Sequence, residues 1–428
     1  MKNNTARFGV INREEFKIQM LNWSSRFNIF CFLDNNNYNF EDPSFECILA
    51  AGCEKSVSLP GSRSFEALKA FSEKNPGWVF GHLNYPSSQR HVLQQSDSIG
   101  FDEGFFFIPE IILRLKDNEL IITSNKFDPE ELFNSVAAQP VKITRSNATK
   151  AAVKSRYTKS EYLSIIQALK KHIQRGDCYE INFCQDFFAD EVLADPLFLY
   201  HALSSFSPNP FASFYKLNDK YCICASPERF LKKTGSKLIS QPIKGTSKRD
   251  AVNIANDLAN KNHLLNSTKE KSENVMVVDL VRNDMSRICT EGSVIVKELF
   301  GIYSFPQVHQ MISTIEGTVA KELHWTDMLK ACFPMGSMTG APKIKVMELI
   351  DRYEVVPRGL FSGTIGYVSP EGNFDFNVVI RSLFYNATKK TISFHAGSGI
   401  TFYSNAEEEY EECMMKASAI IEILKEIS

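Results

Sequence analysis

Residues 158–188 read TKSEYLSIIQALKKHIQRGDCYEINFCQDFF, and this stretch combines a helix signal with a strand signal. Thr158 and Glu161 have the spacing of a capping box, in which each side chain satisfies a backbone N–H at the start of a helix. Apolar residues follow at helical spacing until a glycine ends the pattern. Residues 179–188 then alternate between apolar and polar, as in a strand with one face in a core. We expect the polar face, which carries Glu180, to be wet or to line a site.

The remainder of the chain repeats this mixture of elements. The sequence predicts further strands over residues 221–225, 363–368, 377–385 and 391–395, with a turn at 370–373. Helical patterns begin near residues 158, 250, 270, 343 and 406. Strand clusters mixed with helices predict an α+β fold.

The best domain seam is the polar, irregular stretch from residue 139 to residue 150. It predicts an N-terminal lobe over residues 1–138 and a catalytic region over residues 139–428. No long Gly, Ser or Pro linker and no repeat divides the chain, so we expect the two parts to pack intimately as one unit.

Composition restricts the function further. The chain has 428 residues, of which 43% are hydrophobic, so it can bury a large core. Its formal net charge is −2 with Lys and Arg scattered, which argues against nucleic acid or an anionic membrane as a partner. Residues 1–5 have no hydrophobic signal core, and no apolar run reaches the ~18 residues of a membrane span. We expect a cytoplasmic protein that acts on a small molecule.

The ten cysteines have no zinc-binding or redox spacing. Cys222 and Cys224 alternate with Ile223 in a predicted strand and would point to one face of a sheet. We interpret the cysteines as reduced and mostly buried thiols.

Lys244 is the candidate nucleophile. It lies between a proline and a glycine in the segment Gln241-Pro242-Ile243-Lys244-Gly245-Thr246, an odd place for a lysine that serves only solubility. A lysine that attacks carbon must be neutral, a state favoured by an apolar wall or by nearby cations. The alternative is an ordinary surface lysine in a loop.

Two acidic pairs are candidate metal ligands. Glu270 and Glu273 are three residues apart on one predicted helix, and Glu409 and Glu412 repeat that spacing on the last helix. Each pair therefore projects from one helical face. Mg²⁺ prefers hard oxygen ligands, so two such faces suit one ion. Spacing alone also fits a solvated face, or acids that favour a helix N-terminus.

Six ordered blocks, from about Tyr157 to the end, resemble the chorismate-utilising enzymes. The blocks are Gly176-Asp177-Cys178-Tyr179, Ser226-Pro227-Glu228-Arg229, Pro242-Ile243-Lys244-Gly245-Thr246, residues 273–284, Thr339-Gly340-Ala341-Pro342-Lys343 and Ala396-Gly397-Ser398-Gly399-Ile400. The resemblance implies the fold of anthranilate synthase component I: two packed antiparallel sheets flanked by helices, with the site between them.

The resemblance also implies a reaction. A lysine at the position of Lys244 is typical of members that aminate chorismate at C4, the aminodeoxychorismate synthases, whereas anthranilate synthases typically carry alanine. In the implied path Lys244 adds to C2 while the C4 hydroxyl leaves with a proton from Glu228, and ammonia then adds at C4 and expels the lysine. Water-using members carry lysine where this chain has Glu180. We expect Glu180 to orient ammonia or to act as a second acid or base.

The same resemblance implies the remaining site residues and a partner. It implies that Mg²⁺ binds Glu273 and Glu412 directly, and Glu270 and Glu409 through water. The expected substrate-binding residues are Arg381, Tyr367, Gly397, Ser398, Gly399, Thr339, His309 and Lys416. The chain has no amidotransferase block with a cysteine nucleophile, so we expect a separate glutamine amidotransferase subunit to supply ammonia.

Three alternatives stay open. One is anthranilate synthase component I, which Lys244 disfavours. The second is an isochorismate or salicylate synthase, which Glu180 disfavours. The third is a non-catalytic regulator that binds chorismate or tryptophan and would need neither a proton donor nor a nucleophile.

Overall fold

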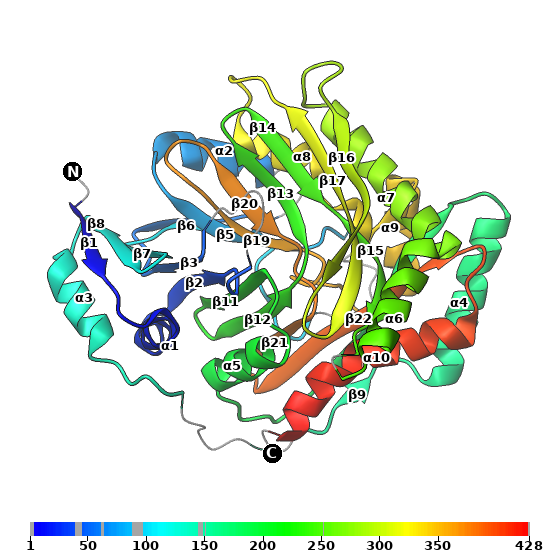
Figure 1. Cartoon of the computed structure of the whole chain (residues 1–428), viewed down its shortest axis with the longest axis horizontal. Coiled ribbons are helices and arrows are strands. Elements are labelled where there is room, and N and C mark those ends of the chain that lie inside the picture. Colours follow the sequence, from blue (N-terminus) through cyan, green and yellow to red (C-terminus); the bar gives the residue numbers. More distant parts are fainter. Residues whose placement is uncertain are drawn as a thin grey trace.

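The computed structural model describes residues 4–38, 45–60, 64–87, 97–143, 149, 151–250 and 252–426. These residues form two large sheets with helices around them (Figure 1). Every strand pairing in this part of the chain is antiparallel. The predicted fold, two packed antiparallel sheets flanked by helices, is confirmed.

Sheet A has twelve strands among the described residues. Along the sheet they are β1 (Asn4–Gly9), β8 (Glu119–Ser124), β7 (Ile111–Lys116), β3 (Cys47–Ala51), β2 (Ile29–Asp34), β11 (Phe211–Leu217), β12 (Lys220–Ser226), β21 (Ser382–Asn386), β22 (Thr391–Thr401), β10 (Glu180–Ala189) and β18 (Gly340–Ala341), with β9 (Lys154–Ser155) paired to β10.

Sheet B has ten strands in the part of the chain that the structure describes. They are β15 (Ile243–Lys248), β17 (Val308–Thr318), β14 (Lys237–Gln241), β13 (Arg229–Thr234), β20 (Phe374–Asn377), β19 (Thr364–Val368), β5 (Val79–Leu83), β6 (Gly104–Ile108) and β4 (Lys55–Ser58), with β16 (Ile295–Ser304) paired to β17.

The helices are α1 (Arg13–Ser24), α2 (Ser64–Lys74), α3 (Pro129–Ala137), α4 (Lys159–Gln174), α5 (Pro196–Phe206), α6 (Ile254–Asn266), α7 (Thr268–Ser286), α8 (Trp325–Cys332), α9 (Lys343–Tyr353) and α10 (Ala406–Glu426), with one 3₁₀ turn, η1 (Gly336–Met338). The capping box predicted for α4 is present, because Thr158 and Glu161 satisfy each other's backbone N–H groups.

Two hydrophobic clusters hold the layers together. The first covers the outer face of sheet A under α1, α3, α4, α5, α9 and α10. The second joins the inner face of sheet A to sheet B and continues to α7 and α8. In β10, Ile181 and Phe183 belong to the first cluster, whereas Glu180 and Asn182 lie on the opposite face. The predicted alternation of this strand is therefore confirmed, and its polar face lies on the side of sheet B.

Strands from both sides of residue 138 enter both sheets. In sheet A, β2 pairs with β11, and in sheet B, β5 pairs with β19. Part of the predicted seam, residues 144–148 and 150, lies outside the described residues. The division into two parts remains a prediction, since each sheet is built from both.

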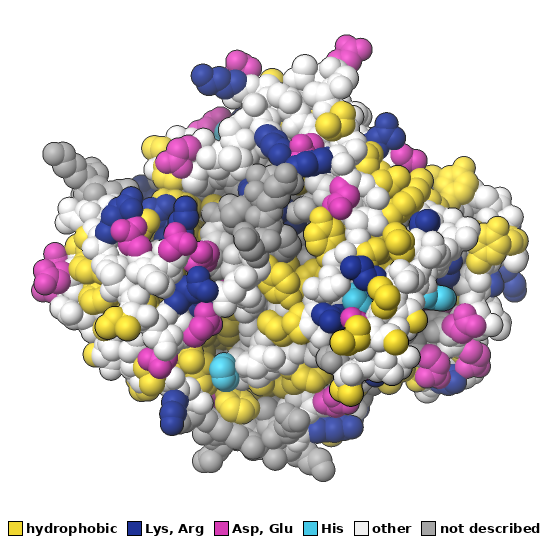
Figure 2. Space-filling model, viewed as in Figure 1, with side chains coloured by type: hydrophobic (Ala, Val, Ile, Leu, Met, Phe, Trp, Pro, Cys, Tyr) yellow, Lys and Arg dark blue, Asp and Glu magenta, His cyan; other side chains and the backbone are white. Residues whose placement is uncertain are grey.

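Surface and thiol features complete the fold. Figure 2 shows Lys and Arg interspersed with Asp and Glu over the visible face. No described helix is long and apolar enough to cross a membrane.

All ten cysteines are free thiols, and Cys222 and Cys224 are buried in the cluster between the sheets. The interpretation of the cysteines as reduced, mostly buried thiols is confirmed.

Candidate active site

The chain crosses from one sheet to the other at two adjacent places, and each crossing carries a predicted site residue. Between β12 and β13 it passes through Glu228, and between β20 and β21 it passes through Arg381. The crossings run side by side, because β12 pairs with β21 in sheet A and β13 pairs with β20 in sheet B. The backbone N–H of Val378 donates to the carbonyl of Glu228 at 3.0 Å and ties them together.

This crossing corrects one prediction. Residues 377–385 were expected to form a single strand, but β20 ends at Asn377 and β21 begins at Ser382 in the other sheet. Arg381 has a φ of 51°, a left-handed conformation that ends an extended run. The strand predicted over residues 391–395 was too short, because β22 continues to Thr401 beside β10. Its pairing with β21 stops at Phe394, so within the described part of the chain the next residues pair with a strand, β10, on one edge only.

Lys244 lies inside the protein, at a β-bulge. The register of β15 against β17 shifts between Ile243 and Thr246, and Gly245 has a φ of 96°, which glycine tolerates best. The Lys244 side chain is 10% exposed, and its Nζ lies 2.6 Å from Oε1 of Glu180. Of the two alternatives for this lysine, the surface loop is therefore wrong.

The charge of Lys244 differs from the expectation. Burial disfavours its ammonium, but the carboxylates of Glu180 and Glu273 outweigh burial and raise the pKa of Lys244 above its usual value. The neutral state was expected from an apolar wall or from neighbouring cations. The structure instead surrounds the ammonium with acids, so an attack by this nitrogen requires prior loss of its proton.

Gly399 allows these groups to meet. A Cβ atom at Gly399 would lie 2.9 Å from Glu180 Oε1 and 2.9 Å from Lys244 Nζ. Such a distance forces one of the groups to move, so the absence of a side chain keeps this face of β22 open. Gly397 lies on the same face, two residues away, and its carbonyl accepts from Lys416 Nζ at 3.0 Å.

Glu228 is a buried carboxyl group with properties of a proton donor. Its residue is 3% exposed, and Ser337 Oγ donates to its Oε1 at 2.5 Å. Burial raises the pKa of Glu228 to about 7, while the Ser337 hydroxyl and the Lys244 ammonium oppose the rise. A carboxyl group with a pKa near the working pH is suited to general acid catalysis.

The two acidic pairs lie on α7 and α10, and both pairs act on Lys269 of α7. Burial opposes the charge of Lys269, and the carboxylates of all four glutamates raise its pKa. Burial also raises the pKa of Glu273 to about 8. On α10, Glu412 Oε1 lies 2.6 Å from Lys416 Nζ and Glu409 Oε1 lies 3.4 Å from Lys269 Nζ. All four carboxyl groups therefore act on the same ammonium group.

The chemistry of this region suits a hard cation. Glu273 Oε1 and Glu409 Oε2 are buried and accept no hydrogen bond. A buried oxygen without a partner is costly, and carboxylate oxygens are the ligands that Mg²⁺ prefers. Among the described residues no three acidic, His or Cys side chains stand in a ligating arrangement.

Arg381 is the candidate anchor for a carboxylate. In the described part of the chain its guanidinium has no acidic partner, and burial lowers its pKa to about 10. A guanidinium can hold a carboxylate with two parallel hydrogen bonds. Because Arg381 immediately precedes β21, it lies next to the open edge of β22.

Comparison with known proteins gives the family of the chain. Residues 30–422 match the family of chorismate binding enzymes. The chain belongs to this family. It is 35% identical over 326 residues to aminodeoxychorismate synthase component 1 of Salmonella typhimurium, covering 74% of this chain and 71% of that protein. It is 37% identical over 272 residues to anthranilate synthase component 1 of Bacillus subtilis, covering 64% of this chain and 52% of that protein.

A solved structure is similar as well. Anthranilate synthase component I from Streptococcus pneumoniae superposes with a TM-score of 0.75 and 25% sequence identity, covering 90% of this chain and 93% of that chain. The protein is thus an enzyme of the chorismate-utilising type.

The other predicted substrate-binding residues make different contacts. Thr339 is buried, and its hydroxyl donates to the carbonyls of Met335 and Gly336. His309 contacts Ser304 Oγ at 2.8 Å and Asp257 Oδ1 at 3.0 Å, an arrangement that fixes its ring between β17 and α6.

Tyr367 and Ser398 also face other groups. Tyr367 packs against the rings of Phe45, Trp78 and Phe80. Ser398 is buried, and its side chain points to the opposite face of β22 from Gly397 and Gly399. Substrate binding by these residues stays a prediction, and Ser398 would have to bind the substrate through its backbone.

The sequence patterns did not point to two buried polar residues, Ser337 and Arg358. Ser337 contacts Glu228, and its neighbour Met338 offers a carbonyl to Arg358 Nη1 at 2.7 Å. Arg358 is buried and paired with Glu354 at 2.6 Å. In the sequence, this ion pair is indicated only by the separation of Glu354 and Arg358, which are four residues apart. Both residues lie in the loop that follows α9.

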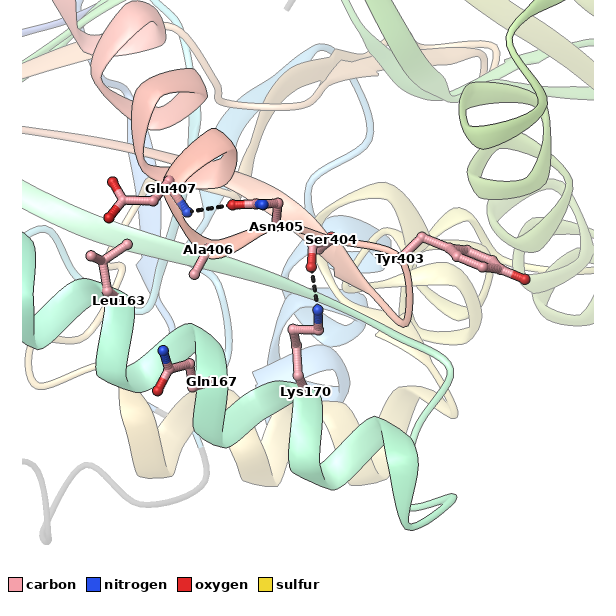
Figure 3. Close-up of a pocket in the computed structure, with 8 residues that line it drawn as sticks. All are labelled: Leu163, Gln167, Lys170, Tyr403, Ser404, Asn405, Ala406 and Glu407. Carbon is pink, nitrogen blue, oxygen red and sulfur yellow. Dashed lines mark hydrogen bonds between the residues drawn. The ribbon is translucent and has the colours of Figure 1, made fainter.

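A separate pocket lies outside this site. It has a volume of about 450 Å³ and opens between α4 and the start of α10 (Figure 3). Lys170 Nζ donates to the carbonyl of Ser404, and the Tyr403 ring points away from the pocket. None of the predicted site residues lines it, so it is not the site of the predicted chemistry.

Proposed function

We propose that this enzyme is an aminodeoxychorismate synthase component I, which converts chorismate and ammonia to 4-amino-4-deoxychorismate and water. The observation that carries the proposal is the burial of Lys244 against Glu180, beside the raised-pKa carboxyl group of Glu228. In this proposal the three side chains would supply a nucleophile, a proton acceptor and a proton donor. The Salmonella relative bears the name of this activity.

The steps follow from these three residues. Glu180 accepts a proton from the Lys244 ammonium over their 2.6 Å contact, which leaves a neutral amine. The amine bonds to C2 of the ring, both ring double bonds shift by one position, and the C4–O bond breaks so that the hydroxyl leaves as water with a proton from Glu228. Ammonia then bonds to C4, both double bonds shift back, and the C2–N bond breaks so that Lys244 leaves as a neutral amine and regains its proton from Glu180. The proton lost by ammonia restores the carboxyl group of Glu228.

Substrate charge requires its own groups. Arg381 would hold one carboxylate of chorismate with paired hydrogen bonds. We propose Glu273, Glu412, Glu270 and Glu409 as the residues that hold Mg²⁺, directly or through water. When bound, Mg²⁺ would neutralise the other carboxylate of the substrate.

The source of ammonia is also proposed. We expect a separate glutamine amidotransferase subunit, since the relatives from Salmonella and Bacillus are both named as component 1. We further propose that the reaction serves 4-aminobenzoate and folate biosynthesis in the cytoplasm. Free ammonium is expected to replace the partner in vitro.

A product analysis tests the proposal. The purified protein is incubated with chorismate, Mg²⁺ and ammonium, and an aminodeoxychorismate lyase is then added. We expect 4-aminobenzoate, and only after the lyase is present. Anthranilate formed without lyase would instead establish the second candidate, anthranilate synthase component I, which the 37% identity to the Bacillus enzyme favours.

A further inference from the structure

Ser337 makes the direct side-chain contact with the carboxyl group of Glu228. It lies in the 3₁₀ turn η1, and its Oγ donates to Glu228 Oε1 at 2.5 Å. Ser337 is 4% exposed and Glu228 is 3% exposed, so water does not compete for this hydrogen bond. A hydrogen bond to a buried carboxyl group is stronger than one at the surface.

The backbone around Ser337 is held from β10. Asn182 Nδ2 donates to the carbonyl of Ser337 at 3.0 Å, and the backbone N–H of Asn182 donates to the carbonyl of Thr339 at 2.8 Å. Both contacts come from the strand that carries Glu180. The position of the Ser337 hydroxyl is therefore fixed relative to Glu180.

A buried cation holds the same turn from the other side. Arg358 Nη1 donates to the carbonyl of Met338 at 2.7 Å, and Arg358 is itself fixed by Glu354 at 2.6 Å. Glu354 Oε1 in turn accepts the backbone N–H of Cys184, again on β10, at 2.9 Å. Several independent contacts thus hold the turn, and they restrict the movement of Ser337.

We propose that Ser337 is a positioning residue that fixes the Glu228 carboxyl group in one orientation and leaves its proton on Oε2. This inference rests on the proposed function, in which Glu228 is the proton donor. Because the Ser337 hydroxyl donates to Oε1, that oxygen acts as the acceptor, and the transferable proton is carried by the other oxygen. The proton therefore has one defined direction of transfer, toward the leaving hydroxyl group.

Other groups around Glu228 do not replace this contact. Among the described residues, Lys244 on β15 is the charged group that acts on Glu228, and the backbone N–H of Ile243 also donates to it. Both remain when Ser337 is changed. The effect of removing the hydroxyl is therefore separable from the effect of these neighbours.

The test compares three variants of the full-length protein. Ser337→Ala removes the hydroxyl, Ser337→Thr keeps it, and Ser393→Ala is the matched control. Ser393 is also a buried serine that donates to a buried carboxylate, Asp186 Oδ1 at 2.6 Å, but it lies elsewhere on the sheet. Amination of chorismate with ammonium is measured as kcat and KM over a range of pH, and thermal melting checks that each variant folds.

For Ser337→Ala we expect kcat to fall about 10- to 100-fold with little change in KM, a part of the ~10²–10⁴ that a positioned acid contributes. We expect the pH at which the rate declines to rise by about one unit, because the lost hydrogen bond favoured the charged carboxylate. Ser337→Thr should restore both values, and Ser393→Ala should match the unchanged protein.

Two outcomes overturn the inference. If the unchanged protein aminates chorismate and Ser337→Ala keeps the same kcat and pH profile, Ser337 does not position Glu228, while the proposed function stands. If no amination occurs at all, the proposed function fails. Infrared spectroscopy then tests separately whether Ser337 donates a hydrogen bond to Glu228. The carboxylic acid signal of Glu228 is identified as the one that Glu228→Gln removes. In Ser337→Ala this signal should titrate at a higher pH than in the unchanged protein. Titration at the same pH in both proteins would refute the hydrogen bond from Ser337.

Discussion

Replacing Glu180 by glutamine should destabilise the fold when no substrate or metal is bound. The change keeps the shape of the side chain but removes the charge that faces Lys244 Nζ at 2.6 Å. The side chains of Lys244 and Glu180 are 10% and 1% exposed, so the ammonium is left buried with a weaker partner. Removing one member of a buried pair typically costs about 3–5 kcal/mol of the free energy of unfolding. We expect a loss in that range at pH 7.

The pH dependence of this loss has a defined sign. In the unchanged protein the folded-state pKa of Lys244 is raised, so its stabilisation is complete below the unfolded pKa of about 10.4 and is lost only above it. In Glu180→Gln the burial that lowers the pKa of Lys244 remains, while the carboxylate that raises this pKa most is gone. The folded-state pKa of Lys244 should then fall below its unfolded value. Stability should therefore rise with pH, by at most about 1.4 kcal/mol per unit.

Urea unfolding at pH 7, 8.5 and 10 measures both effects. The matched control is Glu119→Gln, which breaks a pair with the same 2.6 Å distance, Arg7 Nη1 to Glu119 Oε2, whose side chains are 66% and 43% exposed. An exposed pair contributes about 0–1 kcal/mol, so the control should change little. If Glu180→Gln loses no more stability than the control, or its stability shows no rise with pH, the reasoning about the buried pair is refuted.

Three further results are expected. Glu180→Gln should lower the turnover number for amination by about 10²-fold, because Lys244 loses its proton acceptor; unchanged turnover would remove Glu180 from the acid–base chemistry. Since burial raises the pKa of Glu228 to about 7, the rate should fall as the pH rises through 7 and the acid loses its proton, and a pH–rate profile with no decline there would contradict this role. Arg381→Lys should weaken chorismate binding about 10- to 100-fold in a calorimetric titration, because an ammonium cannot make the two parallel hydrogen bonds; an unchanged affinity would place the substrate carboxylate elsewhere.

Local patterns predicted the elements whose stability is local. The capping box of Thr158 and Glu161 and the alternation of β10 were predicted correctly, since a cap depends on neighbours in the chain and successive side chains of any strand point to opposite faces. The six blocks then predicted the two-sheet fold. They also named Lys244 and Glu228, which the structure buries with linked charges.

The sequence could not show where a strand changes sheets. Residues 377–385 have the pattern of one strand, but the partners that each half meets, β13 and β12, are distant in the chain. A strand follows the hydrogen bonds that its neighbours offer, and those neighbours are brought together only by folding. Glu228 and Arg381 therefore lie at the paired crossings because these strands meet only in the folded protein.

The ionisation state of the site was likewise decided by the tertiary structure. The sequence determined that a lysine, a proton donor and two acidic pairs are present, in an order that identifies the family. It did not determine that Glu180 would face Lys244, or that Ser337 would reach Glu228 over 109 positions of sequence. Charge and hydrogen bonding depend on distance and burial, and these are set only when the two sheets and their helices have packed.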